Sequence, residues 1–286
     1  MNQWRKGIAS WKVGKTLYLS IPFTWLLDDA EIIAKQHKGK VIAGGPAVRL
    51  MGTPWAETPD RVPFDTLSFH NPLATYTSRG CPNKCSFCAV PKIEGDLVEL
   101  DTWKPAPVVC DNNITACSER HFEKVIDSLL PFPMVDFNQG LDAALFTDFH
   151  AWHLSRLQSV KVRFAYDKKH KQTTVKQAID LCRIHRITDI GIYCLIGYDD
   201  SPEIAKSRLD EIRLWKVLPF AMRYQPLDTT IKNSFVADTW TEGKLRKFTQ
   251  YYNHLNFKGF MPFEDFHRYP VGGHEQQQEL FKYVQK

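Results

Sequence analysis

The chain has no long apolar run, and no stretch approaches the ~20 apolar residues that a membrane-spanning helix needs. Its first residues (MNQWRK) are not followed by an apolar segment and a small-residue cleavage site, so we expect no secretory signal. We expect no disulfide framework either, because the seven cysteines are an odd number and three of them cluster. These absences predict a cytoplasmic protein with reduced thiols and no membrane partner.

A strong charge of one sign is also missing. The 37 Lys and Arg residues exceed the 32 Asp and Glu residues by a net charge of +5 at pH 7. This balance suits an anionic substrate, but it is too small to indicate nucleic-acid binding by itself. The length of 286 residues and the apolar fraction of 43% fit one large domain, or one domain with an appendage.

The most informative stretch runs from residue 75 to residue 91 and reads TYTSRGCPNKCSFCAVP. Cys81, Cys85 and Cys88 form a C-x3-C-x2-C pattern there, and we expect them in a loop just past a strand end. Three thiolates in eight residues can wrap one face of a [4Fe–4S] cube and leave the fourth iron open for a substrate or cofactor. Phe87 would place an aromatic ring beside such a cluster.

Half of a zinc site is the alternative reading of this stretch, because structural zinc takes four ligands that commonly come as two spaced pairs. No second C-x2-4-C pair occurs, and none of the ten histidines forms an H-x3-5-H pair placed to complete a site. A non-catalytic iron–sulfur or zinc protein stays open as an alternative function. The remaining cysteines fall at expected strand or helix positions, where free cysteines are usually small buried hydrophobes. They are Cys110, Cys117, Cys182 and Cys194.

From residue 71 the pattern alternates between strands and helices. The expected strands cover residues 74–78, 107–110, 134–137, 160–166, 190–196 and 220–224. Six β/α units with short loops predict a parallel sheet covered by helices, either an open doubly wound sheet or a partial (β/α)6 barrel.

We expect three parts along the chain. Residues 1–70 form an N-terminal α/β extension, with a strand–helix–strand unit over residues 15–43 and an ordered, proline-rich linker over residues 47–72. Residues 71–230 form the β/α unit. Residues 231–286 form a helical segment with an aromatic tail, and the residues on one face of its helix are Leu245, Phe248, Tyr252 and Leu255.

In parallel β/α folds the functional site lies at the carboxyl ends of the strands, where polar residues recur in this chain. They are Asp111, Asn112, Asn113, Asn138, Gln139, Asp142, Arg163, Asp167, Asp199, Arg223, Tyr224 and Gln225. Their convergence is stronger support than any one of them. A single aspartate could equally be a loop or cap residue, and Arg163 could pair with Asp167 or with a neighbouring acid.

The cysteine stretch resembles the signature of radical S-adenosylmethionine enzymes, C-x3-C-x-aromatic-C, at Cys81, Cys85, Phe87 and Cys88. The resemblance covers about residues 40–230 and is specific at the cysteines. It implies the partial barrel, a [4Fe–4S] cluster and S-adenosylmethionine bound to the open iron. It also implies reductive cleavage to a 5′-deoxyadenosyl radical that abstracts hydrogen from a substrate, with a flavodoxin- or ferredoxin-type reductant.

The same resemblance implies roles for the strand ends. Asp111, Asn112 and Asn113 would lie near the methionine amine, although the family's common Gly-Gly-Glu is absent. The segments 138–142, which includes Gln139 and Asp142, and 163–167 would face the ribose and carboxylate. Gly197 would let the backbone approach the adenine closely. Tyr224 completes the expected cofactor-binding set.

Some relatives suggest an RNA or nucleotide methyl- or methylthiotransferase as an alternative, but their extra cysteine domain and RNA-binding barrel are not visible here. The N-terminal unit, which ends in Gly44-Gly45-Pro46, resembles the tail of a cobalamin-binding domain. It lacks the D-x-H-x-x-G motif, so we expect a structural cap and no cobalamin.

A cationic segment follows the fourth expected strand directly. Lys168, Lys169, His170 and Lys171 should therefore lie on the rim of the face that carries the cysteines. We expect them to attract an anionic substrate, such as a phosphorylated metabolite or a nucleotide, through an interaction that salt screens over ~8 Å. The alternative is a solvated loop with no ligand.

Overall fold

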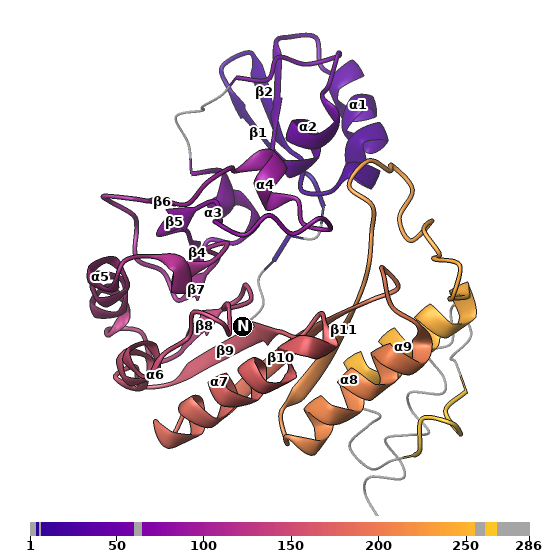
Figure 1. The fold of residues 1–286 in the computed structure, drawn as a ribbon. Helices are drawn as coiled ribbons and strands as arrows, with labels where there is room; N and C mark the ends of the chain where they lie inside the picture. The colour runs from indigo at the N-terminus through magenta and orange to yellow at the C-terminus, as the bar shows by residue number, and fades with distance from the viewer. Residues whose placement is uncertain (1–3, 6, 60–64, 255–260, 268–286) are drawn as a thin grey trace, which may run out of the picture.

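The computed structural model describes residues 4–5, 7–59, 65–254 and 261–267 of the chain. A three-stranded sheet belongs to the N-terminal unit, and a six-stranded sheet makes up most of the remainder (Figure 1). A short two-stranded ribbon is inserted in the sequence between the first and second strands of the six-stranded sheet. None of the helices in these ranges is long and apolar enough to cross a membrane.

The N-terminal unit is a small α/β layer with its own buried cluster. Its elements are β1 (Ala9–Val13), β2 (Thr16–Ser20), the 3-10 turn η1 (Thr24–Leu26), α1 (Leu27–Lys35), β3 (Val41–Gly44) and α2 (Pro46–Met51). β2 and β3 are parallel and are joined through α1, which is the strand–helix–strand unit expected over residues 15–43. β1 is an additional strand, antiparallel to β2.

The segment expected as an ordered linker, residues 47–72, contains two short helices that the sequence analysis did not identify. α2 reaches into its first residues and ends at Met51, and α3 (Thr66–His70) precedes the six-stranded sheet. Asp65 caps α3 by accepting the backbone N–H of Leu67 at 3.1 Å. Helices this short bury too few residues to produce a readable 3.6-residue period, so the sequence pattern misses them.

The six-stranded sheet has its strands in chain order and parallel throughout. Its strands are β4 (Ala74–Thr75), β7 (Val108–Val109), β8 (Val135–Phe137), β9 (Val160–Ala165), β10 (Asp189–Ile196) and β11 (Leu218–Arg223). Every neighbouring pair is parallel, which confirms the expected α/β class. Among the described strands β4 and β11 do not pair with each other, so the sheet is open.

The first expected strand, over residues 74–78, is split in two. β4 belongs to the main sheet, whereas β5 (Ser78–Arg79) pairs antiparallel with β6 (Val98–Glu99). The cysteine-containing loop and α4 (Val90–Ile93) lie between β5 and β6. The two ends of this loop are therefore held together by the two-stranded ribbon of β5 and β6.

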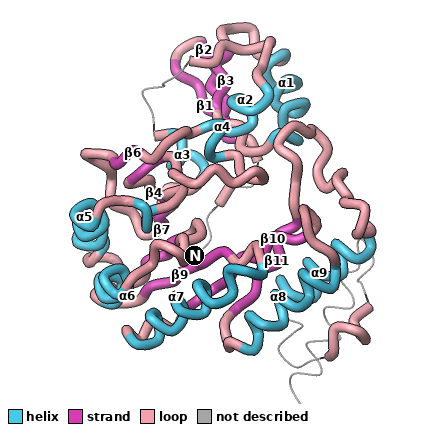
Figure 2. The backbone as a smooth tube through the Cα atoms, viewed as in Figure 1, coloured by secondary structure: helices cyan, strands magenta, loops and turns pink. Residues whose placement is uncertain are grey.

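Helices cover one face of the main sheet (Figure 2). They are α5 (Glu119–Leu129), α6 (Asp148–Ser155), α7 (Gln172–Ile184) and α8 (Pro202–Leu214), with the short turns η2 (Ile114–Ala116) and η3 (Lys169–Lys171). Along β9, Val162 and Phe164 are fully buried in the main hydrophobic core, and the alternate residues Arg163 and Ala165 are only half-buried. The N-terminal unit lies across from α6, α7 and α8, on the other side of the sheet (Figure 1).

The described part of the C-terminal segment packs at the β11 edge. Leu245, Phe248 and Tyr252 of α9 (Glu242–Asn253) are buried, as their spacing predicts, and Leu255 lies outside the described residues. The side-chain amide of Asn253 accepts the backbone N–H of Ala221 at 2.7 Å and donates to its carbonyl at 2.9 Å. This amide pairs with the free edge of β11 as a further strand would.

A buried guanidinium ties the carboxyl ends of β9 and β10 together. Arg208 of α8 is 1% exposed and forms an ion pair with Asp200, whose side chain is 7% exposed. The Arg208 guanidinium also donates to three backbone carbonyls, those of Tyr166 (2.9 Å), Asp167 (2.5 Å) and Leu195 (3.0 Å). Because these carbonyls end or follow the two strands, Arg208 fixes the edge of the sheet at which a β/α site forms.

Replacing Arg208 by methionine should destabilise the fold by about 3–5 kcal/mol, because it leaves the Asp200 carboxylate buried without its partner. Arg183→Met is the matched control, since Arg183 belongs to a half-exposed pair with Asp180, for which about 0–1 kcal/mol is expected. Urea unfolding of both variants measures the difference. An equal loss of unfolding free energy in the two variants would show that Arg208 does not hold the ends of β9 and β10 in place.

Candidate functional site

The three motif cysteines lie in the loop between β5 and α4, and each is half-buried. Burial raises the pKa of the Cys85 and Cys88 thiols, and the neighbouring motif cysteines raise it further. Cys81 contributes to this effect at both thiols. The three residues of the motif therefore lie on one short loop whose thiols influence one another electrostatically.

Gly80 sets the entry to this loop. Its φ of +77° lies in the left-handed region, and a Cβ there would come within 2.1 Å of the Asp96 carbonyl oxygen. The Gly80 N–H donates to the side-chain oxygen of Asn112 at 2.9 Å, and the Cys81 N–H donates to the Gly95 carbonyl at 3.2 Å. A glycine is thus required for the chain to pass this close to the returning strand.

The residues after β7 hold the first cysteine. The Asn113 side-chain amide and the Asn83 backbone N–H each donate to Cys81 Sγ at 3.4 Å. The Asn113 oxygen accepts the Thr115 hydroxyl at 2.8 Å, which orients the amide so that its N–H group faces the sulfur. Hydrogen bonds to sulfur ligands are one of the means by which a protein sets the potential of an iron–sulfur cluster.

Asp111 lies behind the loop. It is 3% exposed, and its carboxylate accepts the Thr77 backbone N–H at 2.6 Å, the Thr77 hydroxyl and the Ser78 hydroxyl at 3.1 Å. Burial raises the pKa of Asp111, and these hydrogen bonds oppose the rise. Asp111 therefore holds the backbone that leads into the cysteine loop. The neighbouring asparagines, Asn112 and Asn113, instead contact Gly80 and Cys81 of the loop itself.

Two further carboxylates border the loop from β8 and β9. Asp142 accepts the Asn83 side-chain amide at 2.7 Å, and its own N–H donates to the Thr115 hydroxyl at 3.0 Å. Asp167 accepts the Leu195 N–H at 2.9 Å, and burial raises its pKa. The charge of Asp167 also raises the pKa of both Cys85 and Cys88.

Aromatic rings connect the loop to the ends of β10 and β11. The Phe87 ring meets the Tyr198 ring edge-on at 5.6 Å, and the Tyr198 hydroxyl donates to the Ser86 hydroxyl at 2.9 Å. Tyr198 in turn lies 4.6 Å from the Tyr224 ring, which meets Phe235 at 5.1 Å. Phe87 and Tyr224 thus belong to one continuous aromatic wall.

Three expected site residues have partners inside the chain that account for them. Gly197 has a φ of +76°, and a Cβ there would come within 2.7 Å of the Leu245 side chain in α9. The Leu245 side chain therefore occupies the space beside Gly197 in which the adenine ring was expected. The Arg163 guanidinium pairs with Asp136 and donates to the Phe137 carbonyl at 3.0 Å, which is the structural ion pair left open above. The Asn138 carbonyl accepts the Tyr193 hydroxyl at 3.0 Å.

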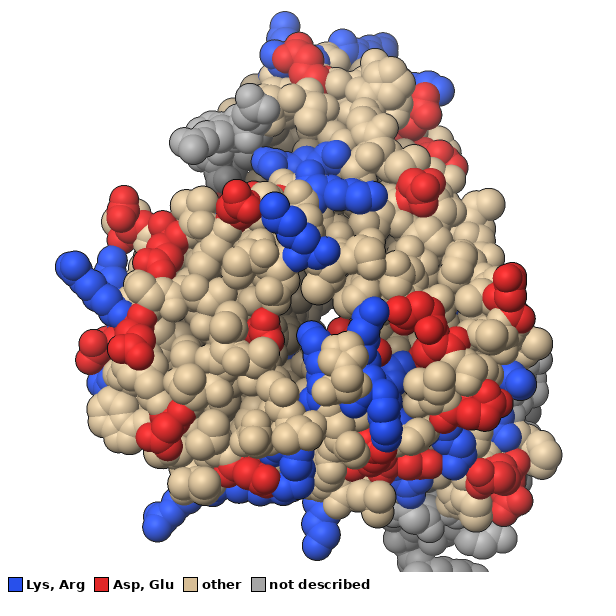
Figure 3. All heavy atoms as spheres, in the orientation of Figure 1, with Lys and Arg blue, Asp and Glu red and all other residues tan. Residues whose placement is uncertain are grey.

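The cationic segment follows β9 directly, and its charge is partly neutralised by acidic partners. Lys168 pairs with Asp199 at 3.0 Å, and Lys169 pairs with Glu211. Lys171 makes no ion pair with a described residue, and its charge opposes the rise in the pKa of Cys85. Lys and Arg side chains border the hollow near the centre of this face (Figure 3).

The other four cysteines are buried and lie on strands, helices or the turns after them. Burial raises the pKa of each of these thiols to about 12. They are Cys110, Cys117, Cys182 and Cys194. Thiols in such surroundings stay protonated and pack as small apolar side chains.

The cysteine loop supplies the kind of ligand that an iron–sulfur cluster takes. A cubane takes each thiolate at a different iron, and the loop holds three half-buried thiols, one of which accepts two N–H groups. Across the described ranges, no group of three or more His, Cys, Asp or Glu side chains is placed to hold one metal ion.

No protein-family model matches the chain, and no curated protein is matched by its sequence.

Four residues at the site are missing from the candidate site residues that the sequence analysis named. They are Asn83, Ser86, Thr115 and Tyr198. Asn83 and Ser86 lie between the motif cysteines, and Tyr198 follows Gly197 directly. Their positions therefore offered a signal, whereas the hydroxyl of Thr115 joins two loops that only the folded chain brings together.

Replacing Gly80 by alanine should distort the cysteine loop, because the new Cβ would collide with the Asp96 carbonyl. Gly95→Ala is the matched control: Gly95 has a φ of +76°, but nothing lies within 4 Å of its Cβ position. Both variants should lose about 1–2 kcal/mol from the left-handed backbone, and Gly80→Ala at least about 1 kcal/mol more.

Urea unfolding measures the stability difference, and the rate at which a thiol reagent labels the motif cysteines reports on the loop. Faster labelling in Gly80→Ala than in Gly95→Ala is expected. Equal stability and equal labelling would show that the loop does not depend on this close approach.

Proposed function

We propose that the protein is a radical S-adenosylmethionine enzyme whose [4Fe–4S] cluster is bound by Cys81, Cys85 and Cys88. On this proposal the open parallel sheet is a partial (β/α)6 barrel, and S-adenosylmethionine binds at the iron without a cysteine ligand. A one-electron reductant of the flavodoxin or ferredoxin type in the cytoplasm supplies the electron.

One observation carries the proposal: the strand ends converge on the cysteine loop. Each strand of the main sheet after β4 is followed by or ends in a residue that contacts the loop, adds charge beside its thiols or continues its aromatic wall. These residues are Asn112 and Asn113 after β7, Asp142 after β8, Asp167 after β9, Tyr198 after β10 and Tyr224 after β11. A loop that served only to connect two strands would not need such a ring of partners.

When bound, the cluster and S-adenosylmethionine supply a 5′-deoxyadenosyl radical that removes a hydrogen atom from an unreactive carbon. The residues of the chain hold and shield this chemistry. Asn83 and Asn113 donate N–H groups to Cys81 and stabilise its thiolate. Asp142 and Asp167 provide negative charge for a cationic cofactor, and Phe87 with Tyr198 excludes water from one side of the loop.

Anaerobically reconstituted protein should bind about four irons per chain. Replacing Cys81, Cys85 and Cys88 together by alanine should abolish the binding, because these residues supply the thiolate ligands. Cys182→Ala is the control, since Cys182 is buried in α7 away from the loop and should leave the iron content unchanged. Iron and acid-labile sulfide analysis measures the outcome; stoichiometric zinc without iron would contradict the assignment.

The reduced, cluster-loaded protein should cleave S-adenosylmethionine slowly to 5′-deoxyadenosine and methionine even without a substrate. Chromatography after dithionite reduction measures the product, and Cys81→Ala should produce none. A protein that carries its full cluster and neither binds nor cleaves S-adenosylmethionine would rule out the proposed activity.

A further inference from the structure

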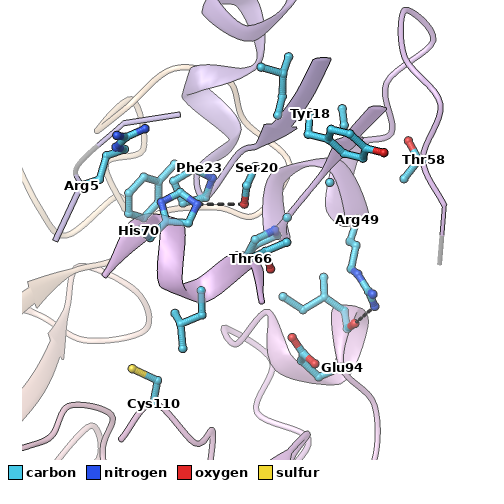
Figure 4. A pocket seen from close by; sticks show the side chains of 18 of the residues that line it. Arg5, Tyr18, Ser20, Phe23, Arg49, Thr58, Thr66, His70, Glu94 and Cys110 are labelled. Carbon is cyan, nitrogen blue, oxygen red and sulfur yellow. Dashed lines mark hydrogen bonds between the residues drawn. The ribbon is translucent and has the colours of Figure 1, made fainter. Parts of the chain in front are cut away.

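A cavity of about 820 Å³ separates the N-terminal unit from the cysteine loop (Figure 4). Its volume falls within the range of ligand pockets in proteins. The N-terminal unit contributes the ends of β2 and β3, including Ser20 and Gly44–Pro46. The opposite wall includes Arg79, which is two residues before Cys81, and Glu94, which follows α4.

Aromatic side chains line much of this cavity. They are Trp4, Trp11, Tyr18, Phe23, Trp25 and Tyr76. The Trp11 ring stacks on Phe69 at 4.1 Å and on Tyr18 at 5.5 Å, and Phe23 stacks on Trp25 at 4.5 Å. These contacts fix the planes of the rings, and a nucleobase can stack on a ring face that they leave uncovered.

The cavity is also cationic. Of the described residues that line it, Arg5, Arg49, Arg79 and Lys232 are basic, whereas Glu94 alone is acidic. Glu94 is neutralised by Arg79. Arg5 and Arg49 are exposed and form no ion pair with a described residue; the Arg49 guanidinium donates to the Ile93 carbonyl at 2.9 Å. Figure 4 shows Arg5 and Arg49 on opposite sides of the cavity.

A neutral polar pair lies between these cations. His70 Nε2 lies 2.9 Å from the Ser20 hydroxyl. Burial and the nearby charge of Arg5 lower the pKa of His70, so the imidazole is neutral at pH 7 and adds no further charge. A neutral imidazole and a hydroxyl can exchange hydrogen bonds with the polar edge of a heterocycle.

We infer that this cavity binds a mononucleotide-like ligand, in which a planar heterocycle lies against the aromatic walls and an anionic group pairs with Arg5 or Arg49. The N-terminal unit is then a binding element and more than a structural cap. If the proposed function holds, the nucleotide is the substrate of the same site, because Arg79 and Glu94 connect the cavity wall to both ends of the cysteine loop.

The cavity is a better anion site than the rim formed by residues 168–171. Lys168 and Lys169 already have acidic partners on the surface, so an anion would have to compete with Asp199 and Glu211. Arg5 and Arg49 have no such competitor among the described residues, and both line the aromatic cavity.

Isothermal titration of the cluster-loaded protein with GMP and with UMP tests the inference, in the presence of saturating S-adenosylmethionine. At least one of the two nucleotides should bind with a stoichiometry near one. The matching nucleoside, which lacks the phosphate, should bind about tenfold more weakly. No binding of either nucleotide, or equal binding of the nucleoside, would overturn the inference.

Two variants locate the anion. Arg5→Gln and Arg49→Gln each remove one exposed positive charge, and we expect at least one of them to weaken nucleotide binding about tenfold. Lys38→Gln is the matched control, because it removes an exposed charge from the same unit outside the cavity. Unchanged affinity in both arginine variants, or an equal loss in the control, would place the nucleotide elsewhere.

A second titration tests whether the ligand is a free mononucleotide and whether its site is separate from that of S-adenosylmethionine. Tighter binding of a single-stranded RNA hexamer than of either mononucleotide would contradict a mononucleotide site. Displacement of the nucleotide when S-adenosylmethionine is added to protein loaded with nucleotide alone would contradict a separate site. Iron content and substrate-free cleavage of S-adenosylmethionine are measured on the same sample. Intact cleavage without nucleotide binding refutes only the cavity inference, and nucleotide binding without cleavage refutes only the proposed function.

Discussion

The buried pair between Arg208 and Asp200 is the interaction on which the candidate site depends. A guanidinium removed from water needs partners for its charge, and the two terminal nitrogens of Arg208 donate to one carboxylate and to three carbonyls at the ends of β9 and β10. The same strand ends carry Asp167, Gly197 and Tyr198. Arg208 of α8 thereby fixes the relative positions of the loops that follow β9 and β10, which hydrogen bonds within the sheet do not connect.

The sequence was sufficient for features that repeat or that carry a distinctive spacing. The apolar-rich runs over residues 160–166 and 190–196 made β9 and β10 predictable, and the spacing of Cys81, Cys85 and Cys88 marked the loop. Arg208 was out of reach, because an arginine on an amphipathic helix ordinarily points into solvent. The division of residues 74–79 between β4 and β5 was also out of reach, since it depends on pairing with β6, twenty residues later.

Asp111 and Gly197 show that a residue at the carboxyl end of a parallel strand can have a structural role instead of contacting a ligand. Both lie at the carboxyl edge of the sheet, where polar and small residues are expected to meet a ligand. The carboxylate of Asp111 supports the backbone that leads to Gly80, and the missing side chain of Gly197 makes room for Leu245 of α9. A residue type suited to a cofactor is equally suited to holding the loop that binds it, and only its partners in the folded chain distinguish the two roles.

The side chain of Asn253 has a consequence for the molecule in solution. An open parallel sheet exposes the N–H and C=O groups of its last strand, and such an edge recruits strands from other chains into aggregates. At Ala221 in the middle of β11, one amide from α9 occupies both groups. The helix thus hinders a strand of another chain from adding to β11 at this position. It does so with one side chain, and no seventh strand is needed to cover the edge.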